Sequence, residues 1–382
     1  MQQNLNEHDL SEHGTVVVGG GPAGCAAATL LARAGCNVLL FEKTSAAHDK
    51  VCGEFISWEA AHYLRLLGLD LHALGAQPID ELRVYDGDTP LAATLPFQAW
   101  SLSRRRLDAA LLDLAHDAGV DVRRGIGIRK LARSDAQWDL SGAHGQCWHA
   151  RNVFLASGKA DVPGARRAHA QSDFIGFKLH LRLAPAEQLA LAASVEVHLF
   201  DTGYAGLELV EGNSANLCLL VTRRLYTEDC GKNWGALLAW LGARSTHLQR
   251  RLSGAEALWP RPLAVYGTPY GYLHDPAATL PGLYRLGDQM AVIPSLAGDG
   301  IAIALHSAFL AARNFMAGGC AATYHRLARD DFHPALRNAA LLSKLAMLRA
   351  RKPALALARR IPALVKLGVQ GSRLAPRNIL PP

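Results

Sequence analysis

Three segments place glycines beside groups that could bind or react with a small molecule. Residues 19–24 read GGGPAG, residues 52–54 read CGE, and residues 287–300 begin with Gly-Asp and end with Gly-Asp-Gly. A glycine-rich turn at the start of a helix offers free N–H groups and a partial positive charge to phosphate. A thiol can act as a nucleophile or redox group, and a carboxylate can accept hydrogen bonds from hydroxyls. These groups work together only if the fold brings the three segments to one site.

The first segment stands in the order that a dinucleotide-binding fingerprint requires. The sequence predicts a buried strand over 15–18, an alanine-rich helix over 25–34, and a second strand over 38–41 that is followed by Glu42. A plain strand–turn–helix connection without a ligand is the alternative, and the acid after the second strand argues against it. A nucleotide cofactor is therefore expected at this turn.

The glycines of the turn have separate expected roles. Gly19 permits the tight turn, Gly21 lets the backbone approach a pyrophosphate, and Gly24 brings the helix close to the strand. Glu42 is expected to accept hydrogen bonds from the adenosine ribose. The neighbouring residues also predicted to contact the cofactor are Pro22, Ala23 and Lys43.

Composition and cysteine usage limit the class of protein. The chain has 382 residues, 50% hydrophobic and 19% charged, as in a globular protein with two or three packed units. Its seven cysteines are scattered and no C-x-x-C pair occurs, which argues against a disulfide framework and a structural zinc site. No metal site is expected.

Charge is distributed unevenly along the chain. The net charge is +7, but residues 341–382 hold nine Lys or Arg and no Asp or Glu, which leaves 31 basic and 33 acidic side chains elsewhere. A nucleic-acid partner is therefore not expected. The basic segment is expected to form helices that pack on the body, with contact to an anionic membrane surface, an acidic carrier or a reductase as the alternative.

The sequence shows no targeting signal. Residues 1–14 are polar and acidic, without the basic and apolar regions of a signal peptide, and no apolar run is long enough to span a bilayer. A cytoplasmic protein is expected. The basic segment adds the alternative of peripheral attachment to the inner face of the membrane.

Later stretches resemble the para-hydroxybenzoate-hydroxylase-like flavoproteins. Residues 282–305, GLYRLGDQMAVIPSLAGDGIAIAL, are similar to the third FAD segment of that family, with a strand over 283–286 and a helix over 301–315. The R-x-x-L-D pattern of residues 104–108 and the Ala-Ser-Gly of 156–158 are similar to two further family motifs. The resemblance implies an FAD cofactor.

The resemblance also implies roles for individual residues. Asp288 is expected to bond the ribityl and diphosphate region of FAD, and Arg104 to lie near the cofactor. The helix that begins near Ile301 is expected to point its N-terminus at the redox ring, where reduced flavin carries negative charge. The other contacts included in the prediction are Ile128, Gly158, Pro294, Gly298 and Gly300.

The segment around Cys52 resembles the geranylgeranyl-reductase and FixC-like branch of this superfamily. The shared stretches are KVCGEFIS (50–57), LASGKADVPG (155–164) and GFKLH (176–180). In that branch the Cys-Gly pair passes the isoalloxazine, so Cys52 and Gly53 are expected at the ring. Cys52 is interpreted as a small residue that shapes the pocket, with a redox thiol or a substrate contact as alternatives.

The middle of the chain is predicted to form an antiparallel sheet that could roof the flavin and enclose an apolar substrate. Tyr204 lies in a glycine-rich turn that resembles a flavin-facing turn of the family, and Lys178 and His180 alternate on one face of a strand. The strand-like runs are a hairpin over 81–100 and stretches at 175–183, 194–200, 204–210 and 217–221. Cys52 and Tyr204 are the candidate catalytic residues.

The expected fold class is α/β, a Rossmann-like FAD-binding domain with an inserted antiparallel sheet and C-terminal helices. Residues 119–122 and 125–128 are predicted to form a strand of the FAD-binding domain. The predicted divisions are 14–80, 101–165 and 280–320 for the FAD-binding domain, 81–100 and 166–279 for the substrate-binding sheet, and 321–382 for a basic helical tail.

The expected function is that of an FAD-dependent oxidoreductase with an apolar aromatic, polyketide or isoprenoid substrate. The leading hypothesis is a monooxygenase that hydroxylates or epoxidises through C4a-hydroperoxyflavin, and the alternative is a reductase or dehydrogenase like the geranylgeranyl reductases. A halogenase is disfavoured because no W-x-W-x-I-P segment occurs, and a maturation factor for a partner protein is the non-enzyme alternative. No second dinucleotide fingerprint occurs, so electrons are expected from transiently bound NAD(P)H or a separate reductase.

Overall fold

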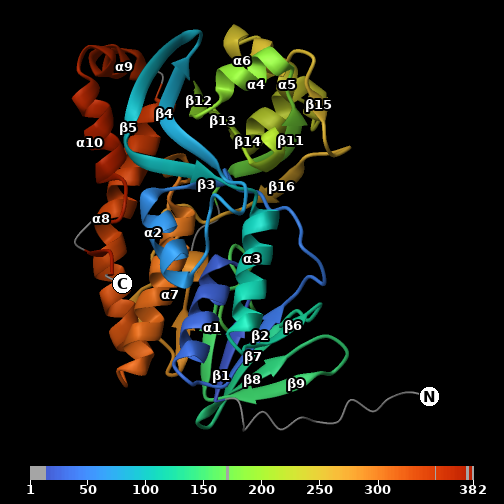
Figure 1. Ribbon diagram of the computed structural model, residues 1–382, viewed down its shortest axis with the longest axis vertical. Coiled ribbons are helices and arrows are strands. Elements are labelled where there is room, and N and C mark those ends of the chain that lie inside the picture. Colours follow the sequence, from blue (N-terminus) through green and yellow to red (C-terminus); the bar gives the residue numbers. More distant parts are fainter. Residues whose placement is uncertain (1–13, 169–171, 349, 376–377, 381–382) are drawn as a thin grey trace.

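Three sheets and ten α-helices make up the part of the chain that the computed structural model describes, residues 14–168, 172–348, 350–375 and 378–380. Figure 1 shows a parallel sheet with its helices in the lower half, a large sheet in the upper half, and helices α8 to α10 along one side of both. The N-terminal residues used to assess a signal peptide, and Arg349 and Arg377 of the basic segment, lie outside the described residues. The expected α/β class is confirmed.

A five-stranded parallel sheet carries the dinucleotide unit. In spatial order its strands are β17 (Leu283–Arg285), β10 (Asn152–Leu155), β1 (Thr15–Val18), β2 (Val38–Glu42) and β6 (Asp121–Arg124). The predicted strand–helix–strand unit is present as β1, α1 (Pro22–Arg33) and β2, with β1 and β2 paired in parallel. Because parallel strands end at one edge, the turn after β1 and the residues after β10 and β17 lie together.

Both faces of the parallel sheet are buried, which explains its almost uninterrupted aliphatic strands. Val17 and Leu40 pack with α1 and α7 (Gly300–Met316), whereas Val16 and Leu39 face the other side. On that side the sheet is covered by a three-stranded antiparallel sheet, which contributes the buried Trp138. The strands of this cover, which the sequence did not predict, are β7 (Lys130–Ser134), β8 (Gln137–Ser141) and β9 (Cys147–Ala150).

The large sheet contains the predicted hairpin and all four predicted strands of residues 175–221. One face packs against α4 (Pro185–Leu191), α5 (Trp234–Gly242) and α6 (Thr246–Leu252), and the other turns toward the parallel sheet and its helices. The strand order is β15 (Glu256–Ala257), β11 (Phe174–Arg182), β14 (Ala215–Thr222), β13 (Gly203–Leu209), β12 (Ser194–Phe200), β4 (Gln77–Asp86), β5 (Thr89–Ser101) and β3 (Phe55–Ile56), and β16 (Leu263–Tyr266) also pairs with β11.

The predicted strand at residues 125–128 is wrong. β6 ends at Arg124 because Gly125 adopts the left-handed conformation, with φ of +78°, which a strand cannot continue. The loop then folds over the end of β2, where the Ile126 N–H donates to the carbonyl oxygen of Glu42 at 3.0 Å. This turn brings Ile126 and Ile128 toward the glycine-rich turn.

The C-terminal helices are packed parts of the body. Tyr324 and Phe332 of α8 (Ala321–Met347) are fully buried in the same core as α1 and α7. α9 (Arg351–Arg360) and α10 (Pro362–Gly371) continue along the edge of the large sheet, and α2 (Trp58–Leu67) and α3 (Arg104–Asp117) complete the helical layer. Among the described residues, the helices are too short or too polar for one of them to cross a bilayer.

Candidate active site

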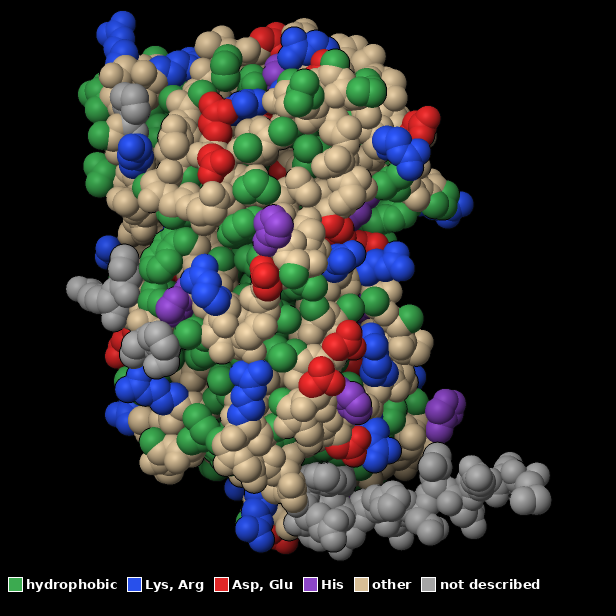
Figure 2. All heavy atoms as spheres, in the orientation of Figure 1, with side chains coloured by type: hydrophobic (Ala, Val, Ile, Leu, Met, Phe, Trp, Pro, Cys, Tyr) green, Lys and Arg blue, Asp and Glu red, His purple; other side chains and the backbone are tan. Residues whose placement is uncertain are grey.

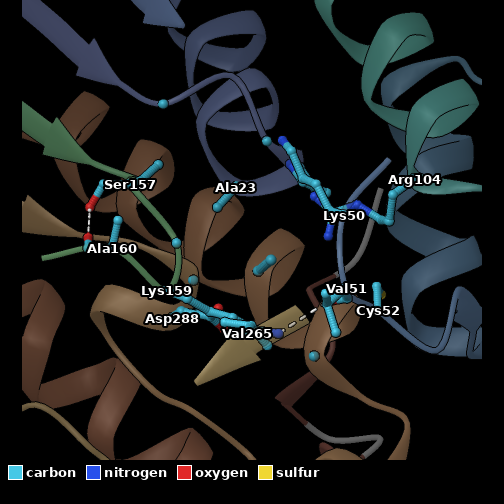
Figure 3. Close-up of a pocket in the computed structure, with 18 of the residues that line it drawn as sticks. Ala23, Lys50, Val51, Cys52, Arg104, Ser157, Lys159, Ala160, Val265 and Asp288 are labelled. Atoms are coloured by element: carbon cyan, nitrogen blue, oxygen red, sulfur yellow. Dashed lines mark hydrogen bonds between the residues drawn. The ribbon is translucent and has the colours of Figure 1, made fainter. Parts of the chain in front are cut away.

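The three glycine-containing segments meet at one cavity of about 700 Å³. Its wall is formed by the turn after β1, the Cys52–Glu54 loop, the Gly287–Asp288 pair and the start of α7. Strand β16 of the large sheet contributes Leu263 to Tyr266 to the opposite side, and Figure 3 shows Val265 below the turn and Arg104 beside it. The cavity is therefore built between the parallel sheet and the large sheet, as the sequence predicted for a cofactor.

At three positions of this wall, the packing of the protein itself does not require a glycine. A Cβ atom added to Gly53 or Gly300 would meet no atom within 4 Å, and one added to Gly21 would meet only Arg104 Nη2, at 3.6 Å. None of the three has a left-handed φ. Their missing side chains instead leave open space along the cavity, which fits an extended ligand lying against the backbone.

Other glycines of the fingerprint serve the fold. Gly19 has φ of +111°, and a Cβ on Gly24 would lie 1.9 Å from the carbonyl oxygen of Gly19. Helix α1 can approach β1 this closely only because position 24 has no side chain, which is the role predicted for it. Gly24 was also predicted to be a cofactor-binding residue, and this is wrong because it does not line the cavity.

Two helix N-termini face the cavity from different elements. Gly21 is the N-cap of α1, and Pro22 and Ala23 of its first turn line the wall. At the start of α7, Gly300 and Ile301 line the wall as well. The positive ends of both helices can therefore stabilise negative groups of one ligand, such as a pyrophosphate and a reduced ring.

Glu42 lies at the end of β2 with its carboxylate nearly buried. The carboxylate accepts hydrogen bonds from the Gly20 N–H at 2.8 Å and from the N–H and hydroxyl of Thr44 at 3.0 and 2.7 Å. Burial alone would raise the pKa of Glu42, but the hydrogen bonds, chiefly those from Thr44, lower it overall. The side chain is held ionised at the wall, in the state that accepts hydrogen bonds from hydroxyls.

Arg104 and Lys50 share one carboxylate beside the glycine-rich turn. Arg104 donates from Nε and Nη2 to Asp108, both at 2.9 Å, and Lys50 donates to Asp108 Oδ2 at 2.8 Å. Although burial opposes it, these two cations lower the pKa of Asp108. Both cations line the cavity with part of their surface, as Figure 3 shows, so they can face an anionic ligand while Asp108 fixes their position.

Behind the Cys52–Gly53 loop lies a buried cluster of polar side chains, of which Glu54 and Lys178 are fully buried. Glu54 has φ of +61°, a conformation that is unusual for a residue with a side chain, and its carboxylate is completely buried. It accepts hydrogen bonds from the Arg104 N–H at 2.7 Å and from Lys178 Nζ, and pairs with His180 Nε2 at 2.7 Å. These contacts hold the loop at the cavity, and they confirm that Lys178 and His180 share a face of β11.

Asp49 completes an arrangement that resembles a metal site. Ligand atoms of Asp49, Glu54 and His180 lie within 4.8 Å of one another. Lys178 Nζ reaches both carboxylates, however, with 3.4 Å to Asp49 Oδ1, and lies 5.5 Å from the ring centre of Trp259. The lysine ammonium therefore supplies the positive charge that a cation would supply there.

The backbone of the Cys52–Gly53 loop is also held from the large sheet. Asn216 of β14 donates from Nδ2 to the Gly53 and Cys52 carbonyl oxygens, at 2.9 and 3.3 Å. Next to it, the pKa of Glu208 is raised well above its usual range, first by burial and then by the charge of Glu54. This face of the sheet therefore positions the loop through polar contacts.

Tyr204 lies behind the wall of the cavity. Its hydroxyl donates to Ser295 Oγ at 2.7 Å, and Ser295 lines the cavity. Tyr270, which also lines it, is a second hydroxyl close to Ser295, and burial raises the pKa of both tyrosines. The expectation that Tyr204 faces the ring directly therefore needs correction, because Ser295 intervenes. Pro294, another predicted contact, does not line the cavity either.

The other predicted contacts lie on the cavity wall, although binding itself remains a prediction. They are Gly19, Gly21, Pro22, Ala23, Glu42, Lys43, Cys52, Gly53, Arg104, Ile128, Gly158, Asp288, Gly298, Gly300 and Ile301.

Sequence analysis missed Ser295 and Lys159 as wall residues. Lys159 Nζ donates to the Val51 carbonyl oxygen at 3.0 Å, so this lysine links the loop after β10 to the loop before Cys52 (Figure 3). For Lys159, the one signal in the sequence was its position in LASGKADVPG, directly after the predicted contact Gly158.

Residues 17–75 match the family model of the NAD(P)-binding Rossmann-like domain. This part of the chain is a Rossmann-like dinucleotide-binding unit. The fingerprint, the parallel strands and the cavity agree with that match.

Curated relatives are oxidoreductase-type enzymes. A tryptophan 2-halogenase of Chondromyces crocatus is 26% identical over 318 residues, which are 78% of this chain and 60% of the halogenase. A menaquinone reductase of Mycobacterium tuberculosis strain H37Rv is 25% identical over 331 residues, 78% of this chain and 75% of the reductase. The chain thus spans less than two thirds of the halogenase and three quarters of the reductase.

Solved structures with the same fold include flavin-dependent halogenases. The brominase Bmp2 superposes with a TM-score of 0.77 at 18% identity, covering 96% of this chain and 93% of the brominase. The halogenase PltM, in a complex with phloroglucinol and FAD, gives a TM-score of 0.69 at 15% identity and covers 88% of this chain and 76% of PltM. These likenesses show the α/β fold.

Proposed function

We propose that this protein is an FAD-dependent oxidoreductase that acts on an apolar organic substrate. The observation that carries the proposal is the single cavity that joins two helix N-termini and three glycines whose missing side chains leave space for a ligand. The residues present fit FAD. Gly21 and α1 would hold the pyrophosphate, Glu42 the ribose, and Asp288 the ribityl chain.

Bound FAD would supply two-electron chemistry, either to oxygen or directly to a substrate. The loop at Gly53 and the start of α7 at Gly300 would flank the redox ring. The wall also includes the aliphatic and aromatic residues Leu263, Val265, Tyr270, Val292 and Ile293. An apolar wall favours an apolar substrate, because burying its surface would drive binding.

Substitution of Gly21 tests FAD binding. A tryptophan at this position would project into the cavity, and the only protein atom near its Cβ would be Arg104 Nη2. We expect G21W to fold normally and to lose FAD binding in a fluorescence titration. G14W is the matched control, because a Cβ at Gly14 also meets open space and Gly14 does not line the cavity. Equal FAD affinity in both variants would contradict the proposed cofactor position.

For the reaction itself, we propose monooxygenation: one oxygen atom enters the substrate, the other leaves as water, and NAD(P)H supplies two electrons. Hydride transfer to a double bond would require a proton donor near the substrate. Glu54, the acid beside the Cys52–Gly53 loop, is bound by Lys178, His180 and the Arg104 N–H. Glu54 is therefore already engaged, and a reductase would have to take its proton from a hydroxyl of the wall, such as that of Ser295, which is why we rank monooxygenation first.

Reduction of a double bond or quinone is the second candidate. The Tyr204–Ser295 contact reaches the cavity and could deliver a proton, and the menaquinone reductases match the chain over three quarters of their length. Halogenation, the activity named for other relatives, is a third outcome that product analysis must separate.

One assay distinguishes the three reactions. Reduced holoprotein is mixed with an alkylated phenol or a prenylated quinone, with and without isotopically labelled oxygen and bromide. Monooxygenation predicts labelled product only with oxygen and no effect of S295A on the rate. Reduction predicts product without oxygen and a rate about 100-fold lower in S295A, the effect of losing a positioned proton donor. Brominated product would identify a halogenase.

A further inference from the structure

The C-terminal helices present an apolar surface that the rest of the protein does not cover. Fourteen large apolar side chains are exposed in the described chain, and eight of them fall between Leu341 and Leu367. Of these eight, the most exposed are Leu367 at 63%, Leu341 at 58% and Leu348 at 51%. We call the exposed apolar side chains of residues 341–367 the leucine surface. Scattered exposed apolar side chains need no explanation, whereas eight along three consecutive helices and their ends indicate an interaction site.

Exposed cations lie on the same helices. Lys344, Lys352, Arg360 and Lys366 are exposed, and no Asp or Glu occurs from residue 341 onward. Figure 2 shows hydrophobic and basic side chains together at the upper left edge of the molecule, where Figure 1 places α9 and α10. A partner of this surface must therefore accept aliphatic side chains and positive charge at once.

The helices are anchored to the body, so the leucine surface has a fixed orientation. Arg351 donates to Asp86 at 2.7 Å and to Asp201 at 2.8 Å. Arg359 donates to the Thr89 carbonyl oxygen at 2.7 Å. These inward-facing cations hold α9 against the tip of the β4–β5 hairpin, while the exposed cations are left for a partner.

We propose that the leucine surface binds the face of an anionic lipid bilayer. Amphipathic helices with leucines on one side and Lys or Arg around them insert their aliphatic side chains at the headgroup boundary and bind acidic lipids through their cations. The described helices cannot span a bilayer, so the contact is one of attachment. This proposal does not depend on the chemistry proposed for the cavity.

A second copy of this chain and an acidic protein are less suitable occupants. A two-fold dimer through this surface would bring the same unopposed positive charges together. Protein interfaces are enriched in Tyr, Trp and Phe, and residues 341–371 contain none of them. The aliphatic side chains and the cations around them suit the hydrocarbon and the acidic headgroups of a membrane.

Vesicle flotation with the full-length holoprotein tests the proposal. We expect the protein to float with vesicles of phosphatidylcholine and phosphatidylglycerol, to stay behind with pure phosphatidylcholine, and to be released by added salt. K352Q, R360Q and K366Q should each weaken the partition about fivefold. L357Q combined with L367Q should abolish it.

Two control variants test whether the effect is specific to the C-terminal helices, and two results would contradict the proposal. K130Q and L189Q alter exposed residues on β7 and α4, away from the C-terminal helices, and should float like the wild type. All variants should retain the wild-type circular dichroism spectrum. The proposal is overturned if anionic vesicles do not bind the wild type. It is also overturned if light scattering shows a dimer that the leucine variants dissociate, since a second copy would then cover the surface.

Discussion

At the scale of single residues, the buried ion pair between Lys178 and Glu54 holds the loop that shapes the cavity. Both side chains are fully buried, and Glu54 adopts φ of +61° in the loop that shapes the cavity. A buried carboxylate without its cation is costly, because it loses hydration without compensation. The loop conformation at Cys52–Gly53 therefore depends on a lysine more than a hundred residues away.

We predict that Lys178→Met destabilises the protein by about 3–5 kcal/mol, the usual cost of removing one partner of a buried ion pair. Urea denaturation followed by circular dichroism measures the change. The double variant Lys178→Met with Glu54→Gln should recover part of the loss, because the remaining carboxylate is then neutral. If the single variant were as stable as the wild type, the pair would not hold the loop.

At the scale of elements, the start of α7 is fastened to the C-terminal segment. Asp299, the N-cap of α7, accepts a hydrogen bond from Ser57, the N-cap of α2, at 2.9 Å and pairs with Arg373 at 3.1 Å. Glu59 lies 3.5 Å from the same guanidinium. One arginine thus lies between two buried acids where two helices begin, next to the cavity.

This arrangement gives Glu59 a pKa of about 7, raised first by burial and then by the charge of Asp299, although Arg373 opposes the shift. Between its ordinary value of 4.5 and about 7, the folded state binds more protons than the unfolded state. The contribution of Glu59 to the free energy of unfolding is therefore fully present below pH 4.5 and is lost as the pH rises through 7.

We predict that Glu59→Gln, whose side chain resembles protonated glutamate, removes the loss of stability that the wild type shows as the pH rises. Relative to the wild type, the variant should gain stability as the pH rises, up to about 3 kcal/mol near neutral pH, and show little difference at low pH. Denaturant midpoints across this range measure the effect. Glu256→Gln, at an exposed position of β15, should leave the profile unchanged. A constant difference at every pH would rule out the titration of Glu59 as its cause.

At the scale of the whole molecule, the cavity lies where the parallel sheet, the large sheet and α7 meet. A ligand that fills it would contact all three and bind only to the folded state. We predict that FAD raises the unfolding free energy by about 2.7 kcal/mol at a hundredfold excess over its Kd. Differential scanning fluorimetry across FAD concentrations measures the accompanying rise in Tm. The rise should vanish in G21W, and a rise of equal size in that variant would place FAD elsewhere.

Sequence alone determined the elements whose signals are local. The β1–α1–β2 unit follows from an aliphatic run, glycines of defined conformation and an alanine-rich helix. The β4–β5 hairpin follows from alternation around a glycine turn. In each case neighbouring residues fix the backbone, so the pattern can be interpreted without knowing the rest of the fold. The resemblance to flavoproteins added the prediction of FAD and many of the residues that line the cavity.

Only the tertiary structure decided which distant side chains meet. Lys178 reaches Glu54 across 124 positions, Arg373 reaches Asp299 across 74, and Ser295 separates Tyr204 from the cavity. The three-stranded cover of the parallel sheet and the end of β6 at Arg124 were equally outside local prediction. Such contacts depend on strand register and on how layers pack. A short segment of sequence specifies neither the strand register nor the packing of layers, because the partner of a buried charge belongs to another part of the chain.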